Sequence, residues 1–131
     1  MFDINPADAA PIWRQIEEGM RRLITVGALA PGGAVPSVRD LARELRVNPA
    51  TVSRAYQRLT DAGVLSVRRG DGTYVADEPA QLKKSERHEL LRDAAARYAS
   101  AAISAGVELD EAAAELEAAW QRLGREHRRR A

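Results

Sequence analysis

The chain has 131 residues, of which 45% are hydrophobic and 5% aromatic, so it can form one ordinary domain, or one small domain with a helical appendage. It has no cysteine, which excludes disulfides, thiolate metal sites and a cysteine nucleophile. The formal net charge is only +1, so total charge does not indicate a partner. No apolar run is long enough for a membrane span, and residues 1–6 do not resemble a signal peptide, so we expect a cytoplasmic protein.

The first predicted helix begins near Pro11 and carries apolar residues such as Ile16 and Leu23 at helical spacing. Gly27 is placed to end this helix in a left-handed conformation. A turn follows in residues 29–33, where proline and glycine supply the required backbone geometries.

Two capped helices joined by a short turn are predicted next. Ser37 is a typical N-cap for the first of them, and Asn48 caps the second, with Pro49 in the first helical position. Gly63 ends the second helix. The apolar faces of the two helices comprise Val38, Leu41, Ala42 and Leu45 in the first, and Val52, Ala55, Tyr56 and Leu59 in the second.

A hairpin completes this part of the chain. Residues 64–68 and 73–75 alternate like strands, and the loop between them, residues 69–72, has glycines where positive φ is needed. Helix, turn, helix and Gly-rich hairpin form the pattern of a winged helix-turn-helix, which places its second helix in the major groove of DNA. Residues 35–75 contain seven arginines and four acidic residues, a local charge of +3, which favours the same partner.

The composition changes at Asp77–Pro79, so we predict two domains, residues 1–78 and residues 79–131. The second contains two helices separated near Gly106, giving a mainly α fold with a small β-hairpin (α+β). Two helices cannot close a core alone, so their apolar residues require a second chain or the winged domain. The residues we assign to a dimer interface are Leu91, Tyr98, Leu109, Leu116, Trp120 and Leu123.

Three segments, Pro36–Ala42, Val47–Tyr56 and Gly63–Val75, resemble in order and spacing the DNA-binding module of the GntR family of bacterial transcription regulators. Residues 11–16 are also similar, with Trp13 where tyrosine is usual. The short remainder after Glu78 resembles the tail of the YtrA-type subgroup. That resemblance implies tail helices that pair across a two-fold axis, and often control of a transporter operon.

The resemblance also implies which residues contact DNA. Some relatives have a base-reading arginine where this chain has Pro49, and that contact cannot form here. The contacts implied by the family are Arg39, Thr51, Ser53, Arg54 and Gly70. The position of Arg54 opposite the apolar stripe supports its role, and position on the second helix or the hairpin adds Arg58, Arg68 and Arg69.

We therefore expect a homodimeric DNA-binding regulator, a repressor, on an inverted-repeat operator. The alternative is a winged-helix adaptor that binds a protein instead of DNA, but the polar face of Thr51, Ser53, Arg54 and Gln57 lacks apolar anchors. An RNA-binding protein would need exposed aromatic residues, whereas Tyr56 and Tyr74 fall in buried patterns. The sequence shows no metal-ligand cluster, cofactor motif or catalytic arrangement, and no residue group identifies a small-molecule effector.

Overall fold

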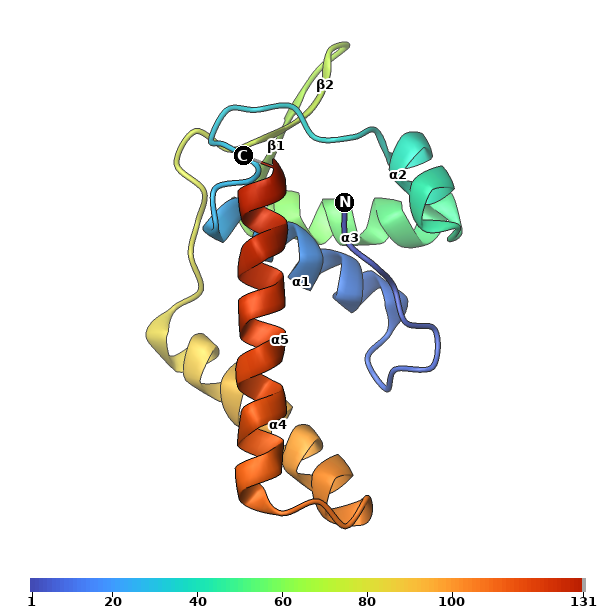
Figure 1. Ribbon diagram of the computed structural model, residues 1–131. Helices are drawn as coiled ribbons and strands as arrows, with labels where there is room; N and C mark the ends of the chain where they lie inside the picture. The colour runs from blue at the N-terminus through green and yellow to red at the C-terminus, as the bar shows by residue number, and fades with distance from the viewer. Residues whose placement is uncertain (131) are drawn as a thin grey trace. The chain divides into compact units, whose positions relative to one another are not determined.

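The computed structural model describes residues 1–130, with side chains as far as residue 124, and divides them into two compact units, residues 1–80 and 81–130 (Figure 1). The first unit contains the helix-turn-helix and the hairpin, and the second contains two long helices. The elements of the first unit are α1 (Ile12–Thr25), α2 (Val38–Leu45), α3 (Pro49–Asp61), β1 (Leu65–Arg68) and β2 (Gly72–Val75). The winged helix-turn-helix predicted from the sequence is confirmed.

The ends of these helices follow the predicted capping signals. Ser37 Oγ accepts a hydrogen bond from the Asp40 N–H at 3.1 Å, and Asn48 Oδ1 accepts one from the Ala50 N–H at 2.8 Å. Gly27 and Gly63 have φ of +87° and +81°, in the left-handed region that lets the chain turn away after α1 and α3. These signals are local, which is why the sequence alone revealed them.

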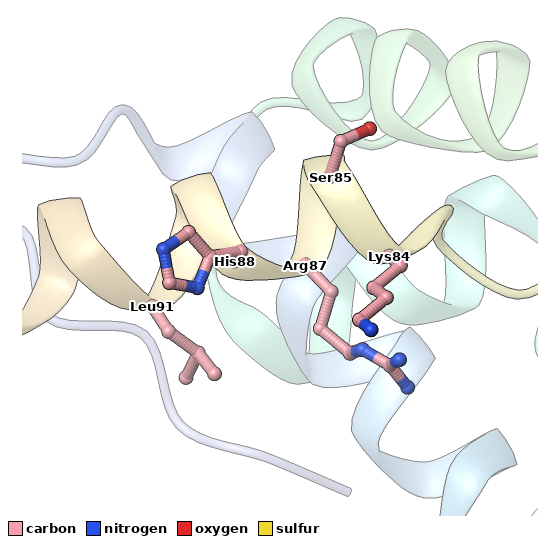
Figure 2. A pocket seen from close by; sticks show the side chains of 5 residues that line it. All are labelled: Lys84, Ser85, Arg87, His88 and Leu91. Atoms are coloured by element: carbon pink, nitrogen blue, oxygen red, sulfur yellow. The ribbon is translucent and has the colours of Figure 1, made fainter.

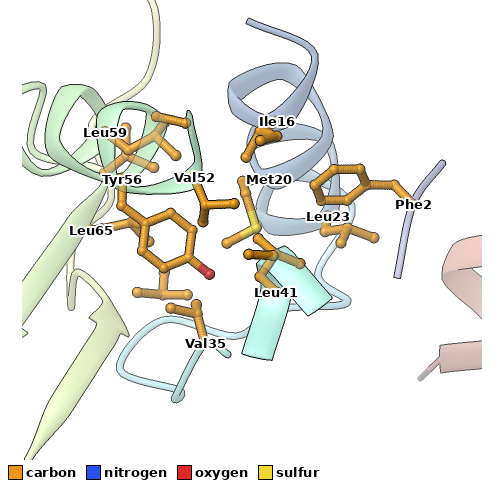
Figure 3. Packing of buried hydrophobic residues seen from close by; sticks show 14 residues of the cluster. Phe2, Ile16, Met20, Leu23, Val35, Leu41, Val52, Tyr56, Leu59 and Leu65 are labelled. Atoms are coloured by element: carbon orange, nitrogen blue, oxygen red, sulfur yellow. The ribbon is translucent and has the colours of Figure 1, made fainter. Parts of the chain in front are cut away.

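The core of the first unit lies where α1 and α2 pack against α3. Figure 3 shows Ile16 and Met20 of α1 facing Leu41 of α2 and Val52 of α3, all with no exposed surface. Tyr56 is also buried, and its hydroxyl donates to the Pro36 carbonyl at 2.7 Å. The outer faces of α2 and α3 remain in solvent as a consequence.

The hairpin pairs β1 with β2 in antiparallel register, from Leu65 opposite Val75 to Arg68 opposite Gly72. Its loop is therefore residues 69–71, one residue shorter than predicted. The segment before α2 adds a short third element that the sequence did not indicate, because Ala34 bridges Tyr74 and the Val35 N–H donates to the Thr73 carbonyl at 3.0 Å. These bonds tie the hairpin to the start of the helix-turn-helix.

The second unit consists of α4 (Lys84–Ser104) and α5 (Leu109–Arg130), joined by a turn in which Gly106 has φ of +75°. The Tyr98 hydroxyl donates to the Ala112 carbonyl at 2.6 Å, and Ala112 is buried between the helices. No residue of α4 is buried, and Leu109 and Trp120 of α5 are 83% and 75% exposed. No helix in the described part of the chain is long and apolar enough to cross a membrane.

Candidate nucleic-acid interface

The exposed face of α3 is the first component of the site. Val52, Ala55 and Leu59 point into the core, which leaves the opposite side of the helix to solvent. Ser53 and Arg54 are exposed there, while Thr51, on the flank, is half-buried. Pro49 and Ala50 leave the N-terminal end of the helix small, and in helix-turn-helix proteins that end contacts the base edges.

The two arginines of α3 turn toward α1. The guanidinium carbons of Arg54 and Arg58 lie 4.6 Å and 4.5 Å from the ring centre of Trp13. Arg58 Nε also donates to Glu17 Oε1, one helical turn after Trp13 on α1. Arg58 is therefore neutralised by an acidic partner, whereas Arg54 takes part in no ion pair or hydrogen bond among the described side chains.

The first turn of α2 contributes Arg39, which is exposed and lies two residues after the capping Ser37. On the same helix Arg43 forms an ion pair with Asp40, with 3.6 Å between the nitrogen and the oxygen. Arg39 has no partner of this kind in the described residues, so it is the cation of α2 that is available to a phosphate.

The hairpin carries two arginines near its tip, of which Arg68 contacts an aromatic ring of the described residues and Arg69 does not. The guanidinium of Arg68 lies 3.9 Å from the ring centre of Tyr74, and the Tyr74 hydroxyl donates to Asp71 at 2.9 Å. That hydrogen bond to a carboxylate raises the pKa of Tyr74. Tyr74 is half-buried rather than buried as predicted, because it lies on the ladder and Arg68 covers it. Arg69 is exposed and forms none of the ion pairs that the described residues show.

Gly70 lies at the point of the hairpin with φ of +77°, in a turn closed by the Asp71 N–H and the Arg68 carbonyl at 2.9 Å. Positive φ at the third residue of a turn is the requirement that glycine meets without strain. A Cβ built at Gly70 would contact nothing within 4 Å, so this backbone can approach a ligand closely. At the tip, therefore, no side chain of Gly70 shields the backbone from solvent.

Trp13 and Glu17 are the neighbours of this surface that the sequence did not identify. Each lies on α1, and their partners Arg54 and Arg58 lie on α3, four residues apart in both helices. The equal spacing is a usable signal, since residues four apart share a helix face. It becomes informative only when the packing of α1 on α3 is known.

The tail shows a shallow hollow along the first turns of α4. Figure 2 shows Lys84, Arg87, His88 and Leu91 around it, and Ser85 completes the lining. All of these residues come from one helix, so the hollow does not enclose a ligand as a small-molecule pocket does. Among the described residues there is also no cluster of three His, Asp or Glu side chains that could hold a metal ion.

The comparisons with known proteins agree with this geometry. Residues 13–75 match the family model of bacterial regulatory proteins, gntR family. The chain is 34% identical over 110 residues to the HTH-type transcriptional repressor YtrA of Bacillus subtilis (strain 168), covering 84% of this chain and 85% of YtrA.

Two solved structures extend the comparison. A transcriptional antiterminator from Listeria monocytogenes EGD-e superposes with a TM-score of 0.70 at 28% identity, covering 94% of this chain and 92% of that one. A crystal structure of the AraR DNA-binding domain in complex with operator ORX1 gives a TM-score of 0.52 at 27% identity, covering 58% of this chain and 93% of that one. The module seen here thus has the fold of a module that binds operator DNA.

Proposed function

This chain belongs to the GntR family of bacterial regulatory proteins, and we propose that it acts there as a homodimeric repressor of an inverted-repeat operator. Membership makes it a DNA-binding transcription regulator of the YtrA type and not an enzyme. Membership in the family leaves open the contact residues, the oligomeric state, the form of the operator and the direction of control.

The observation that carries the proposal is the shared exposure of the α3 face and the hairpin tip on one winged unit. A face with Ser53, Arg54 and Gln57 offers donors to bases and phosphates, and it lacks the apolar anchors that a protein partner needs. The residues we propose for DNA contact are Arg39, Thr51, Ser53, Arg54, Arg68, Arg69 and Gly70. Arg58 lies at the edge of this surface, held by Glu17.

Two copies are proposed because the tail leaves apolar side chains uncovered. Leu91, Leu116 and Trp120 are exposed in the described chain, although such residues are normally buried. Pairing of two tails across a two-fold axis covers them and brings two winged units to one duplex. A pseudo-palindromic site then follows, with half-site centres about 34 Å apart, one turn of DNA.

Repression is the direction we propose because the similar regulator YtrA is a repressor. A dimer bound across a promoter blocks polymerase by occupancy alone. A regulator of this family acts on DNA inside the bacterial cell, so the location we propose is the cytoplasm. Control of a transporter operon is the corresponding proposal for the target.

The test is selection of bound duplexes from a random DNA library with the full chain, repeated at two salt concentrations. We expect an enriched inverted repeat, with affinity that falls steeply as salt rises because phosphate contacts release counterions. Genes beside the matching genomic sites then identify the operon, and a reporter under that promoter shows whether the protein lowers expression.

The outcomes that contradict the proposal are specific. An enriched direct repeat or single half-site refutes the two-fold arrangement. Binding without sequence preference refutes operator recognition and favours the adaptor. Selection from a matched RNA library distinguishes an RNA-binding role, which the antiterminator resemblance makes worth including.

A further inference from the structure

Trp13 of α1 gathers three arginines around one ring. Arg54 and Arg58 reach it from α3, at 4.6 Å and 4.5 Å from the ring centre, and Arg14 lies at 5.5 Å from its own helix. A tryptophan face is the best aromatic surface for a guanidinium, because its electron-rich face attracts the cation and its area matches the planar group. The ring is half-buried against the core, so it is a fixed surface.

Glu17 forms an ion pair with Arg58 but not with Arg54, so the two arginines of α3 differ in their interactions. Arg58 Nε donates to Glu17 Oε1, so one of its donors and its charge are occupied. Arg54 also lies over the Trp13 ring but forms no ion pair or hydrogen bond among the described residues, so its N–H groups are unoccupied. Arg54 lies diametrically opposite the buried stripe of α3, where a residue that reads the groove must lie.

We propose that Trp13 is a positioning residue for sequence reading, holding the Arg54 guanidinium flat with its donors toward the major groove, while Glu17 withholds Arg58 from DNA. The inference rests on the proposed placement of α3 in the groove. In this role Trp13, which lies on α1 outside the helix-turn-helix, determines how Arg54 of α3 is oriented toward the DNA.

The physical advantage lies in the entropy of a long side chain. A free arginine samples many rotamers, and ordering it on binding lowers affinity. Contact with Trp13 restricts those rotamers before DNA binds. Each hydrogen bond to a base edge then entails a smaller loss of side-chain conformational entropy. A bidentate contact to guanine needs the guanidinium plane in one orientation, so the benefit falls on sequence preference more than on total affinity.

The experiment uses the full chain and the operator enriched by library selection, with a shuffled duplex as the non-specific competitor. Affinities for both duplexes are measured for Trp13→Leu, Arg54→Ala and the double variant. We expect Arg54→Ala to weaken operator binding about 5- to 150-fold. Trp13→Leu should weaken it about two- to tenfold and leave the shuffled duplex nearly unchanged.

The double variant distinguishes positioning from general packing. If Trp13 acts through Arg54, adding Trp13→Leu to Arg54→Ala has no further effect on operator affinity. Trp13→Phe keeps an aromatic face and should recover most of the preference, and it remains informative if Trp13→Leu fails to fold. Thermal unfolding of every variant verifies that a folded protein is being compared.

The Glu17 half of the inference has its own measurement, the slope of affinity against salt. Arg58→Ala should leave that slope unchanged, whereas Arg69→Ala should reduce it by about one phosphate contact. Glu17→Gln releases Arg58, so it should strengthen binding to both duplexes and steepen the slope.

The results that overturn the inference differ from those that overturn the proposed function. An equal loss from Trp13→Leu with and without Arg54 shows a packing role only. A wild-type operator affinity in Arg54→Ala removes the residue that Trp13 is proposed to position, while operator binding by the protein stands. Failure to enrich any duplex refutes the proposed function, and the inference with it.

Discussion

Tyr56 joins α3 to the segment that leads into α2. Its ring is buried in the core, and its hydroxyl donates to the Pro36 carbonyl at 2.7 Å, one residue before the capping Ser37. Burial, together with the negative charge of Glu44, raises the pKa of Tyr56 above its ordinary value near 10. The folded protein therefore keeps this proton where the unfolded chain releases it.

That difference predicts a loss of stability in alkali. Below pH about 10 both states hold the proton and the contribution is intact. As pH rises above about 10 the unfolded chain binds fewer protons than the folded one, so the free energy of unfolding falls, by up to about 1.4 kcal/mol per pH unit. Urea unfolding from pH 8 to 11 measures it. Tyr56→Phe should show a shallower slope, and identical slopes would contradict the assignment.

Gly19 sits beneath an aromatic ring at the start of the chain. A Cβ built at Gly19 would lie 2.7 Å from the Cδ2 atom of Phe2, which is closer than real contacts allow. Gly19→Ala should therefore destabilise the protein by about 1–3 kcal/mol through overpacking, despite the better helix propensity of alanine. Chemical unfolding at a fixed protein concentration measures the change.

As a control, the effect of Gly19→Ala on stability should change sign when the Phe2 ring is removed. In a Phe2→Ala background the ring is gone, so Gly19→Ala should stabilise the helix by about 0.5–1 kcal/mol. A loss of stability in both backgrounds would show that the obstacle is something other than the Phe2 ring.

Helix α2 depends on its N-terminal cap for stability. It has eight residues, short enough that the unpaired N–H groups of its first turn weigh heavily. Ser37→Ala removes the acceptor for the Asp40 N–H and should lower the free energy of unfolding by about 1 kcal/mol. Ser37→Asp keeps an acceptor and serves as the control; equal losses in the two variants would refute the cap.

Local signals made most elements predictable. Ser37, Asn48 and the glycines after α1 and α3 each act through bonds within a few residues, so the sequence contains the whole cause. The bridge from Ala34 to Tyr74 was missed because it joins residues forty apart in sequence. The contact between Arg54 and the Trp13 ring was missed for the same reason, since it exists only once α1 packs on α3.

For the predicted DNA-contact residues, too, local properties could be predicted from the sequence and contacts between distant elements could not. Sequence position placed Arg54 and Arg69 on exposed faces, which needs only helical periodicity and a hairpin register. It could not show that Glu17 occupies Arg58 or that Tyr74 stacks under Arg68, because those partners come from other elements or depend on strand pairing. The exposure of these arginines was predictable from the sequence pattern, whereas their interaction partners were not.

The two tail helices, α4 and α5, do not bury their large apolar side chains within one chain. Ala112 is buried between α4 and α5, but small residues at that contact bury little area. The larger side chains of α5 remain in solvent, with Leu116 at 55% and Trp120 at 75% exposure. A helix pair of this kind gains most of its stability from a second copy, which is the physical basis for the proposed dimer.

Leu116→Glu tests that dimer. The side chain is exposed in one chain, so the substitution should leave the fold of a single chain intact while placing a charge in the proposed interface. Sedimentation should change from dimer to monomer, and operator affinity should fall about a hundredfold or more because the two half-sites are then bound independently. Affinity for a single half-site should stay constant, since the α3 face and the hairpin are untouched.

Glu115→Gln is the matched control, since it also changes an exposed side chain of α5 but lies outside the apolar set. It should sediment and bind operator as the wild type does. If Leu116→Glu remains dimeric, the two-fold contact lies elsewhere on the chain. If it becomes monomeric yet keeps full operator affinity, each winged unit binds on its own and the inverted repeat has no role in recognition.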